Sequence, residues 1–376
     1  MEPGVRKYQI KDICHLEKGK QIDTDLLDDS NQYKYINGGI EISGLYSEYN
    51  TTGQTIIVSE GGASCGYVNY MEEPFWCGCH CYRLTDIKMN PKYVFYALKA
   101  NQDKIMKLRT GSAMPNIKKS SFECFQIRLS ENITEQNYVV KVLEKICALI
   151  KLRKRQIEKF YMLINARFIE LVGDPENNPN NWPIVTIGAV IKSCESGWSG
   201  NGTQRPRKDG EIAVLKVSAV TKGYFLPTEC KVLDDQVNIK KYISPEKGDL
   251  LFSRANTREM VGATAVITQD YPELILPDKL WKIRFINTVN VFYMKYILSY
   301  PTVRAKFSAV STGTSGSMYN VSMDKFKMME IPMPAWEVQE QFAAFVAQVD
   351  KSKAAVQKSL DEMQLLFNSL MQEYFG

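Results

Sequence analysis

Histidine is nearly absent from this sequence: only His15 and His80 occur among its 376 residues. A Ser/His or Cys/His catalytic pair, or a zinc site made of several histidines, would have to use one of these two side chains. Cys77, Cys79 and Cys81 flank His80, but no second CxxC follows at zinc-ribbon spacing. We interpret these cysteines as strand residues whose alternate side chains point to opposite faces. The sequence therefore predicts neither hydrolysis nor a metal site.

Long apolar runs, a signal peptide and a large charge excess are missing as well. The most apolar helical stretch, 139–152, is interrupted by Lys141, Glu144 and Lys145, and no window approaches the ~20 apolar residues of a membrane span. Lys and Arg number 47 against 42 Asp and Glu, so a polyanionic partner is allowed but not required. The nine cysteines are irregularly spaced. We expect a soluble, reduced protein of the cytoplasm with no membrane partner.

Two further segments resemble enzyme motifs only in part. Asn90-Pro-Lys-Tyr93 is similar to the Asn-Pro-Pro-Tyr of adenine methyltransferases, but its third residue differs and no glycine-rich cofactor loop precedes it. A helix start with Pro91 in the first turn accounts for it better. The glycine-rich stretch 197–202 fits neither a nucleophile elbow nor a phosphate loop and favours a mobile loop. No catalytic residues are predicted.

What the sequence does contain is an internal repeat of about two hundred residues. The stretch 114–122 recurs as 318–326, and an apolar strand pattern follows each copy before a long helical pattern. A second match pairs 94–96 with 291–293, both of sequence Val-Phe-Tyr, at an offset of 197. The chain is therefore expected to consist of two copies of one plan.

The two helical patterns, 131–172 and 336–375, are the clearest secondary-structure predictions. Apolar residues recur every three and four positions, with no Pro or Gly inside, and the two patterns match at an offset of 203. A repeat of 3.5 residues keeps one stripe facing a partner helix along the whole length, which indicates a coiled-coil seam. The seam is predicted to contain Leu143, Ile146, Ile150, Ile157, Phe160, Ile164, Val346, Val349, Val356, Leu360, Met363 and Phe367.

Length and charge favour pairing of these helices with each other. Each has about 40 residues, a rod of ~60 Å. The first carries eight Lys and Arg against five Asp and Glu, and the second carries three against six, so they should attract. We expect an antiparallel pair, because each helix follows its own globular segment. The alternative is two amphipathic helices that each cover only their own domain.

The remaining segments predict mixed α/β units, so that the fold class is α+β. Short strands are expected at 55–59, 212–217, 262–267 and 281–286, and one short helix near 91–107 or 290–308. Gly173 and the following proline-rich stretch 174–183 should end the first long helix and form a linker. The predicted boundaries are 1–130 and 174–335 for the globular segments and 131–173 and 336–376 for the helices.

Loops with small or basic residues could contact nucleic acid. Gly- and Ser-rich loops recur at matching places, 59–66 against 253–259 and 110–112 against 311–317, and small residues let a phosphate backbone approach closely. Arginines on loops can fork onto guanine or neutralise phosphate, although an ordinary solvated surface explains any single cluster as well. The candidate DNA-binding residues are Lys18, Lys20, Lys118, Lys119, Arg205, Arg207, Lys208, Lys216, Ser218, Arg254, Arg258, Ser315 and Tyr319.

Taken together, the chain resembles the specificity subunits of type I restriction–modification systems along its whole length. The resemblance rests on the repeat, its two long helices and a set of short segments in a fixed order. These segments are Trp182 to Val190, Leu215 to Ser218, Gly248 to Arg254, the run of Gly, Thr and Ser before Met318, Ile331 to Pro334, and Gln339 to Phe342.

The resemblance implies a non-catalytic DNA reader with two target recognition domains. Each domain would read one half of a split, asymmetric site in the major groove of duplex DNA. The helices would set the spacer and dock two methyltransferase subunits, which bind S-adenosylmethionine; motor-nuclease subunits would join through the complex. No cofactor is implied for this chain itself. In the second domain Lys216, Arg254 and Arg258 would reach DNA, while the first copy has no arginine matching Arg254.

Two other functions stay open at this point. The chain could be an accessory or fragment of a fused DNA methyltransferase, in which case it should bind S-adenosylmethionine alone. It could also be a coiled-coil scaffold without affinity for DNA. Such a scaffold would leave the Gly, Ser and Arg loops unexplained.

Overall fold

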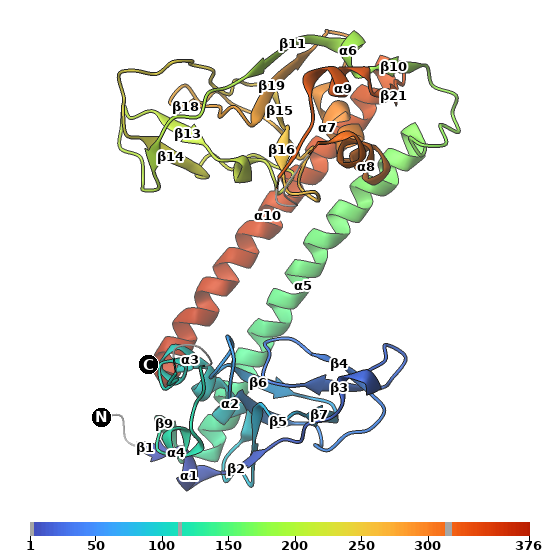
Figure 1. Ribbon diagram of the computed structural model, residues 1–376. Helices are drawn as coiled ribbons and strands as arrows, with labels where there is room; N and C mark the ends of the chain where they lie inside the picture. The colour runs from blue at the N-terminus through green and yellow to red at the C-terminus, as the bar shows by residue number, and fades with distance from the viewer. Residues whose placement is uncertain (1–3, 112–114, 313–317) are drawn as a thin grey trace. The chain divides into compact units, whose positions relative to one another are not determined.

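The computed structural model describes residues 4–111, 115–312 and 318–376, which form two compact units (Figure 1). Unit 1 consists of Met1–Gln156 and Val356–Gly376, and unit 2 consists of Ile157–Ala355. Two helices contribute residues to both units: α5 (Ile133–Val172) and α10 (Trp336–Phe375). Within the described residues, no helix is long and apolar enough to cross a membrane.

Unit 1 is built on a four-stranded antiparallel sheet in the order β2-β8-β5-β6, with a three-stranded sheet β4-β3-β7 and a pair β1-β9. The central strand β5 is buried at every position, because its Ile-Ile-Val run faces side chains on both sides. The elements are β1 (Val5–Gln9), α1 (Ile10–Ile13), β2 (His15–Lys18), the 3-10 helix η1 (Thr24–Leu26), β3 (Tyr33–Ile36), β4 (Gly44–Tyr46), β5 (Thr55–Ser59), β6 (Val68–Met71), β7 (Phe75–Cys77), β8 (Cys81–Thr85), α2 (Pro91–Ala100), α3 (Gln102–Met106), α4 (Lys119–Glu123) and β9 (Gln126–Ser130).

Unit 2 has a four-stranded antiparallel sheet in the order β11-β19-β15-β17, a second sheet β12-β14-β13-β18, and two short pairs, β16-β20 and β10-β21. Its elements are β10 (Ile184–Thr186), α6 (Ile187–Val190), β11 (Ile191–Ser196), β12 (Gly202–Thr203), β13 (Ala213–Leu215), the 3-10 helix η2 (Val217–Ala219), β14 (Cys230–Leu233), β15 (Leu250–Ser253), β16 (Ala255–Asn256), β17 (Thr264–Val266), β18 (Leu274–Ile275), β19 (Leu280–Phe285), α7 (Val291–Ser299), α8 (Pro301–Val310), β20 (Tyr319–Asn320), α9 (Met323–Met328) and β21 (Glu330–Pro332).

Strand order and direction confirm the internal repeat. The order β2-β8-β5-β6 corresponds to β11-β19-β15-β17, and β4-β3-β7 corresponds to β14-β13-β18. β3 and β13 hold the same place in these sheets, and each is antiparallel to one neighbour and parallel to the other. The two units are therefore copies of one topology.

The structure corrects the register of one repeat match and the number of short helices. Asn90 and Asn290 cap the matching helices α2 and α7 with their side chains, so these helices align at an offset of 200. The Val-Phe-Tyr match at 197 is wrong by almost one turn. Where one short helix is predicted in each copy, there are two. Asn101 ends α2, and Pro301, which has no amide hydrogen to donate, starts α8.

The long helices begin and end close to the predicted residues. Gly173 follows α5 with a φ of +86°, and its amide donates to the carbonyl of Ile169 at 2.9 Å. A Cβ on Gly173 would lie 2.7 Å from Pro179 Cγ. Glycine therefore ends the helix for two reasons: the left-handed backbone and the returning linker.

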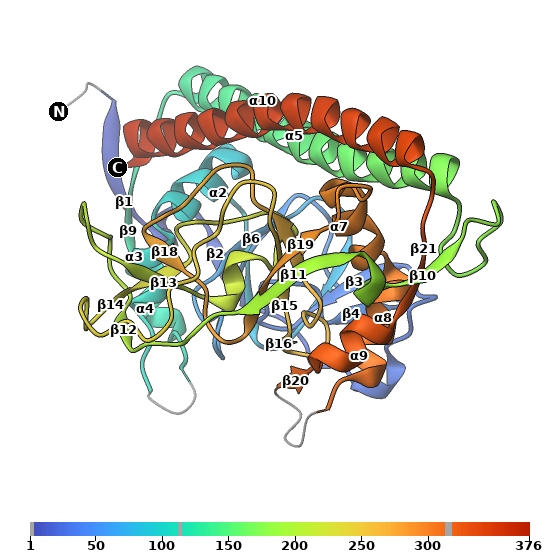
Figure 2. The same cartoon turned by 90° about the horizontal axis from the view of Figure 1, so that it is seen from above.

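Both long helices enter the hydrophobic core of each unit. In unit 1, Val139 and Leu143 near the start of α5 share a core with Met371 and Phe375 at the end of α10. Figure 2 shows these last turns of α10 beside the first turns of α5. In unit 2 the opposite ends meet, with Phe168 of α5 in ring contact with Phe342 of α10, their centroids 5.3 Å apart. In each unit the start of one long helix packs against the end of the other, so the expected antiparallel pairing is confirmed.

All twelve residues predicted for the seam are buried or half-buried. Leu143, Ile146, Ile164, Val346, Val349 and Leu360 are buried, whereas Ile150, Ile157, Phe160, Val356, Met363 and Phe367 are half-buried. Apolar side chains off this stripe, such as Leu152 and Leu365, are exposed. The alternation follows from the 3.5-residue spacing, which places one face of each helix inward.

Candidate nucleic-acid interface

The two units carry opposite charges at the same position, directly after β5 in unit 1 and directly after β15 in unit 2. The carbonyl of Glu60 accepts from Ile117 N at 2.8 Å, and the carbonyl of Arg254 accepts from Val321 N at 2.9 Å. The preceding residues, Ser59 and Ser253, also make matching bonds. Glu60 therefore occupies in unit 1 the place that Arg254 has in unit 2. The position that holds an arginine in the second copy therefore holds a glutamate in the first copy.

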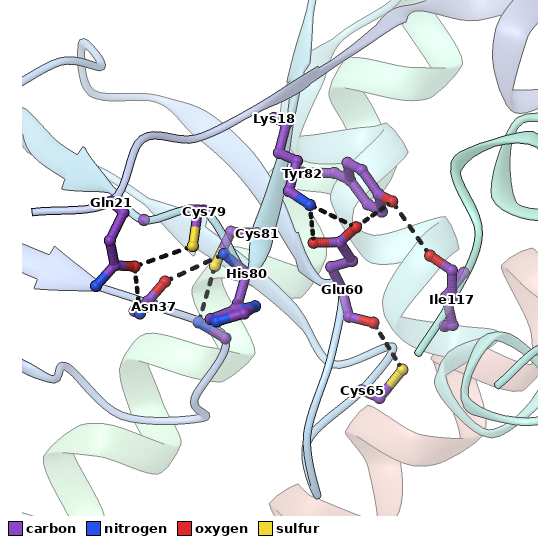
Figure 3. A network of polar contacts seen from close by, with 12 residues as sticks. Lys18, Gln21, Asn37, Glu60, Cys65, Cys79, His80, Cys81, Tyr82 and Ile117 are labelled. Atoms are coloured by element: carbon purple, nitrogen blue, oxygen red, sulfur yellow. Dashed lines mark hydrogen bonds and ion pairs between the residues drawn. The ribbon is translucent and has the colours of Figure 1, made fainter. Parts of the chain in front are cut away.

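In unit 1, Glu60 joins a small polar network with Lys18 and Tyr82 (Figure 3). Lys18 Nζ lies 2.7 Å from Glu60 Oε2, and the Tyr82 hydroxyl donates to Oε1 at 2.8 Å. The Glu60 side chain is 9% exposed and that of Lys18 53%. Burial, and then the Glu60 carboxylate, raise the pKa of Tyr82. The network holds the Lys18 ammonium group at the end of β2, where it remains open to solvent.

Tyr82→Phe should lower the free energy of unfolding of unit 1 by about 1–2 kcal/mol, because the buried Glu60 carboxylate loses a hydrogen-bond donor. Urea unfolding of the variant and the parent measures this difference. Tyr70→Phe is the matched control, since no hydrogen bond of the Tyr70 hydroxyl is found among the described residues, and it should change stability by less than ~0.5 kcal/mol. Equal stability of Tyr82→Phe and the parent would contradict the role given to this hydroxyl.

The cysteine and histidine cluster beside this network is a turn, not a continuous strand. Cys77 ends β7 and Cys81 begins β8, both fully buried, while Cys79 and His80 lie in the connecting turn. Cys79 Sγ donates to Gln21 Oε1 at 2.9 Å (Figure 3). The interpretation of all three cysteines as strand residues is wrong because Gly78 starts the turn. Among the described residues, no group of three or more His, Cys, Asp or Glu side chains could hold a metal.

The other unit 1 candidates are exposed and lie on two further segments. Lys20 follows β2 and bonds through its backbone amide to the carbonyl of Cys77. Lys118 caps α4, and Lys119 lies 3.7 Å from Glu123 one turn later. None of the three contacts the Glu60 network in the described residues.

In unit 2, Arg254 is held by residues that the sequence did not single out. Its Nε donates to the backbone carbonyl of Asp278 at 2.8 Å, and its Nη2 lies 3.7 Å from the carboxylate of the same residue. Ser199 donates to that carboxylate, and Ser196 donates to the Asp278 carbonyl at 3.1 Å. Tyr319 lies on β20 opposite Asn256 of β16, the strand that directly follows Arg254. A Ser-x-x-Ser spacing at 196–199 was the only sequence signal for this cluster.

The glycine-rich stretch 197–202 is anchored to this cluster, in contrast to the mobile loop expected. Trp198 N donates to the carbonyl of Leu276 at 2.9 Å. A Cβ on Gly197 would lie only 1.9 Å from that same carbonyl oxygen. Glycine is therefore needed here for close approach of the backbone to Leu276, the residue after β18.

A second group of unit 2 candidates lies mostly around the sheet β12-β14-β13-β18. Arg205 makes a two-pronged contact with Glu211, at 2.7 and 2.8 Å, and lowers the pKa of that carboxyl to about 2. Lys216 lies 2.8 Å from Glu229, and hydrogen bonds from Lys216 and then Ser218 lower the pKa of Glu229. Arg207 lies 4.0 Å from Glu273. Lys208 and Arg258 have no carboxylate within 4.0 Å among the described residues, and Ser315 lies outside the described residues.

Most of these cations are therefore neutralised by a carboxylate of the chain itself. Lys18, Lys119, Arg205, Arg207, Lys216 and Arg254 each have such a partner. A phosphate or a base edge would have to compete with that carboxylate. These cations therefore favour a ligand with well-placed hydrogen-bond acceptors over a ligand that offers negative charge alone. Guanidinium groups held in this way are suited to recognition by hydrogen bonding.

Comparison with known proteins identifies relatives along the chain. The model of the type I restriction modification DNA specificity domain matches residues 3–159 and 179–364. A putative type I specificity subunit of Mycoplasma genitalium is 32% identical over 174 residues, which cover 43% of this chain and 45% of that protein. The EcoKI specificity subunit of Escherichia coli K12 is 23% identical over 339 residues, covering 84% of this chain and 72% of that protein. The chain thus spans less than half of the mycoplasma relative.

Solved structures share the fold. The crystal structure of a type I restriction–modification S subunit from M. genitalium matches with a TM-score of 0.66 and 19% sequence identity. The match covers 100% of this chain and 97% of the chain in that structure. A second structure, from work on complex assembly and conformational transition of the type I restriction–modification system, has a TM-score of 0.53 and 14% identity. At these identities the likeness concerns the fold alone.

Proposed function

Because the chain belongs to the family of type I restriction–modification specificity subunits, we propose that it reads a split, asymmetric site in duplex DNA and has no catalytic activity of its own. The duplicated unit carries this proposal. Each copy presents a different set of side chains at the same place after its central strand, Glu60 with Lys18 in unit 1 and Arg254 with Asp278 in unit 2. Two copies of one reader with different contacts suit a site whose halves differ in sequence.

The proposed division of the chain follows the repeat. Residues 1–130 and 174–335 form the two target recognition domains, and 131–173 and 336–376 form the spacer helices. Two methyltransferase subunits dock on the chain and supply S-adenosylmethionine and the methyl transfer, and restriction motor-nuclease subunits join through that complex. This chain then needs no cofactor.

Arg254→Ala should relax recognition at one position of one half-site, at a cost of ~1–3 kcal/mol in binding of the specific duplex. Lys208→Ala should instead weaken binding to all DNA sequences alike, because an unpaired ammonium group neutralises phosphate. The slope of log affinity against log salt concentration should also fall by about one unit. Fluorescence anisotropy with duplexes varied base by base measures both effects in the complex with the methyltransferase subunits. If Arg254→Ala discriminates among bases as the parent does, its assignment to a base is incorrect.

Mapping of adenine methylation in the native host, with and without this gene, tests the proposal as a whole. Loss of one split motif is the expected result and gives both half-sites and their spacer. If no motif is lost, expressing the chain with its methyltransferase in a host without such systems decides whether the native copy is silent or the function is wrong. Titration of the isolated chain with S-adenosylmethionine tests the methyltransferase alternative, which predicts binding. The scaffold alternative predicts no retention on duplex DNA at low salt.

A further inference from the structure

A pocket in unit 2 lies where α5, α7 and the residues after α7 meet. Its volume is about 690 Å³, and it is lined by Tyr161, Phe168, Lys295, Tyr296 and Tyr300, among others. A smaller pocket of about 210 Å³ shares some of these side chains and is also lined by Asp350 and Lys353 of α10. The larger volume falls within the range of small-molecule sites, and its lining combines four aromatic rings with a few polar side chains. The function proposed above does not use this pocket.

Lys295 is the polar group shared by both pockets, and it has no anionic partner. Among the described residues, no carboxylate lies within 4.0 Å of its ammonium group and no hydrogen bond is found for it. Its Nζ lies 3.9 Å from the centre of the Tyr296 ring. The nearby Asp350 carboxylate is already bound to Lys353 at 2.5 Å. Burial lowers the pKa of Lys295 to about 8, partly offset by Asp350. Taken together, the two pockets are therefore lined by two ammonium groups and one carboxylate.

A pocket in unit 1 corresponds to the smaller of these two pockets and supplies its own anion. It lies between β6, α2 and α5 and is lined by Tyr70, Lys92, Tyr96 and Glu144, among others. Glu144 forms a hydrogen-bonded ion pair with Lys92. Counted from the first long helix to the second at their offset of 203, the position of Glu144 is occupied by Ala347. At the offset of 200 that aligns α2 with α7, Lys92 corresponds to Phe292 and Phe95 to Lys295. Unit 2 has therefore lost this ion pair and carries its lysine at a different position, without the carboxylate.

From this difference we propose that the unit 2 pocket binds a small organic carboxylate with an apolar body. The ligand carboxylate pairs with the ammonium group of Lys295, and the apolar body of the ligand packs against Tyr161, Phe168 and Tyr300. A charge-assisted hydrogen bond to a partly desolvated ammonium group is stronger than a neutral one, so the charged form of the ligand is preferred.

Phenylacetate and its uncharged isostere phenylacetamide are suitable probes, titrated into the full chain by NMR with observation of the probe. We expect phenylacetate to bind at least roughly tenfold more tightly than phenylacetamide, as expected for a charge-assisted hydrogen bond. Lys295→Met should remove this preference, and Lys295→Arg should keep it. Lys306→Met, an exposed lysine on α8, is the control and should bind both probes as the parent does.

Three results would each overturn the inference: equal binding of the two probes, no binding of phenylacetate at tens of millimolar, or unchanged preference in Lys295→Met. Circular dichroism and the thermal midpoint identify any variant that has not folded. If Lys295→Met has not folded, Lys295→Arg still tests the inference, because this variant keeps the charge and must keep the preference for phenylacetate over phenylacetamide. None of these results depends on whether the chain reads DNA.

Discussion

Asp249→Ala is expected to lower the free energy of unfolding of unit 2 by about 3–5 kcal/mol, because it leaves Lys282 and Arg284 with only the half-exposed Glu246 carboxylate as a counter-charge. The Asp249 side chain is 0% exposed. Its carboxylate lies 3.2 Å from Lys282 Nζ and accepts from Arg284 Nε at 2.7 Å and from the backbone amide of Glu246 at 2.6 Å. Asp249 precedes β15, and the two cations lie on the neighbouring strand β19, so the carboxylate ties two strands and a turn together.

Urea unfolding followed by tryptophan fluorescence measures the effect, because four of the five tryptophans lie in unit 2. Asp278→Ala is the matched control: its carboxylate is 45% exposed, and its loss should cost no more than ~1 kcal/mol. Asp249→Leu combined with Lys282→Met should recover part of the loss, since both members of the buried pair are then apolar. A loss no greater for Asp249→Ala than for the control would show that the ion network is not needed for stability.

Gln339→Leu is expected to cost about 2–4 kcal/mol, because two backbone groups lose their hydrogen-bond partner in a buried place. Gln339 lies in the first turns of α10 and is 1% exposed. Its Oε1 accepts from the Asn290 amide at 2.9 Å, and its Nε2 donates to the Pro334 carbonyl at 2.9 Å. One side chain thus fixes the start of the long helix to the start of α7.

The same bond pattern occurs in unit 1, which makes a matched test possible. Gln136 accepts from the Asn90 amide at 2.9 Å and donates to the Ser130 carbonyl at 2.8 Å. Gln136→Leu should therefore destabilise unit 1 by a similar amount and leave unit 2 unchanged, which hydrogen exchange resolved by segment can measure. Gln341→Leu, at an exposed position of α10, should change stability by less than ~0.5 kcal/mol. If all three substitutions have the same effect, the buried amide has no special role.

Periodicity predicted the long helices to within a few residues, since an apolar stripe that repeats every 3.5 residues along the whole of α5 and α10 is typical only of paired helices. The β-branched residues of 55–59 predicted the position of β5. The strands predicted at 212–217 and 262–267 were too long, because neighbours in space decide where strand pairing ends. The offset of 197 was wrong because three identical letters, Val-Phe-Tyr, outweighed the single capping asparagine that fixes the register of α2 and α7.

The candidate site was harder to predict than the fold. The basic residues could be chosen by type, but the carboxylate partners of two central ones lie far away in sequence: Glu60 is 42 residues from Lys18, and Asp278 is 24 residues from Arg254. No local pattern carries such a pair. The assignment of individual residues to DNA stays a prediction.

By itself the sequence determined the duplication, the paired long helices and the family, because each of these is written in order and spacing along the chain. Only the tertiary structure decided that Glu60 and Arg254 occupy one equivalent position, that most candidate cations are already neutralised, and that Lys295 is not. Charge balance in a folded protein depends on distances of a few ångströms between residues remote in sequence, and these distances exist only once the strands and helices have packed.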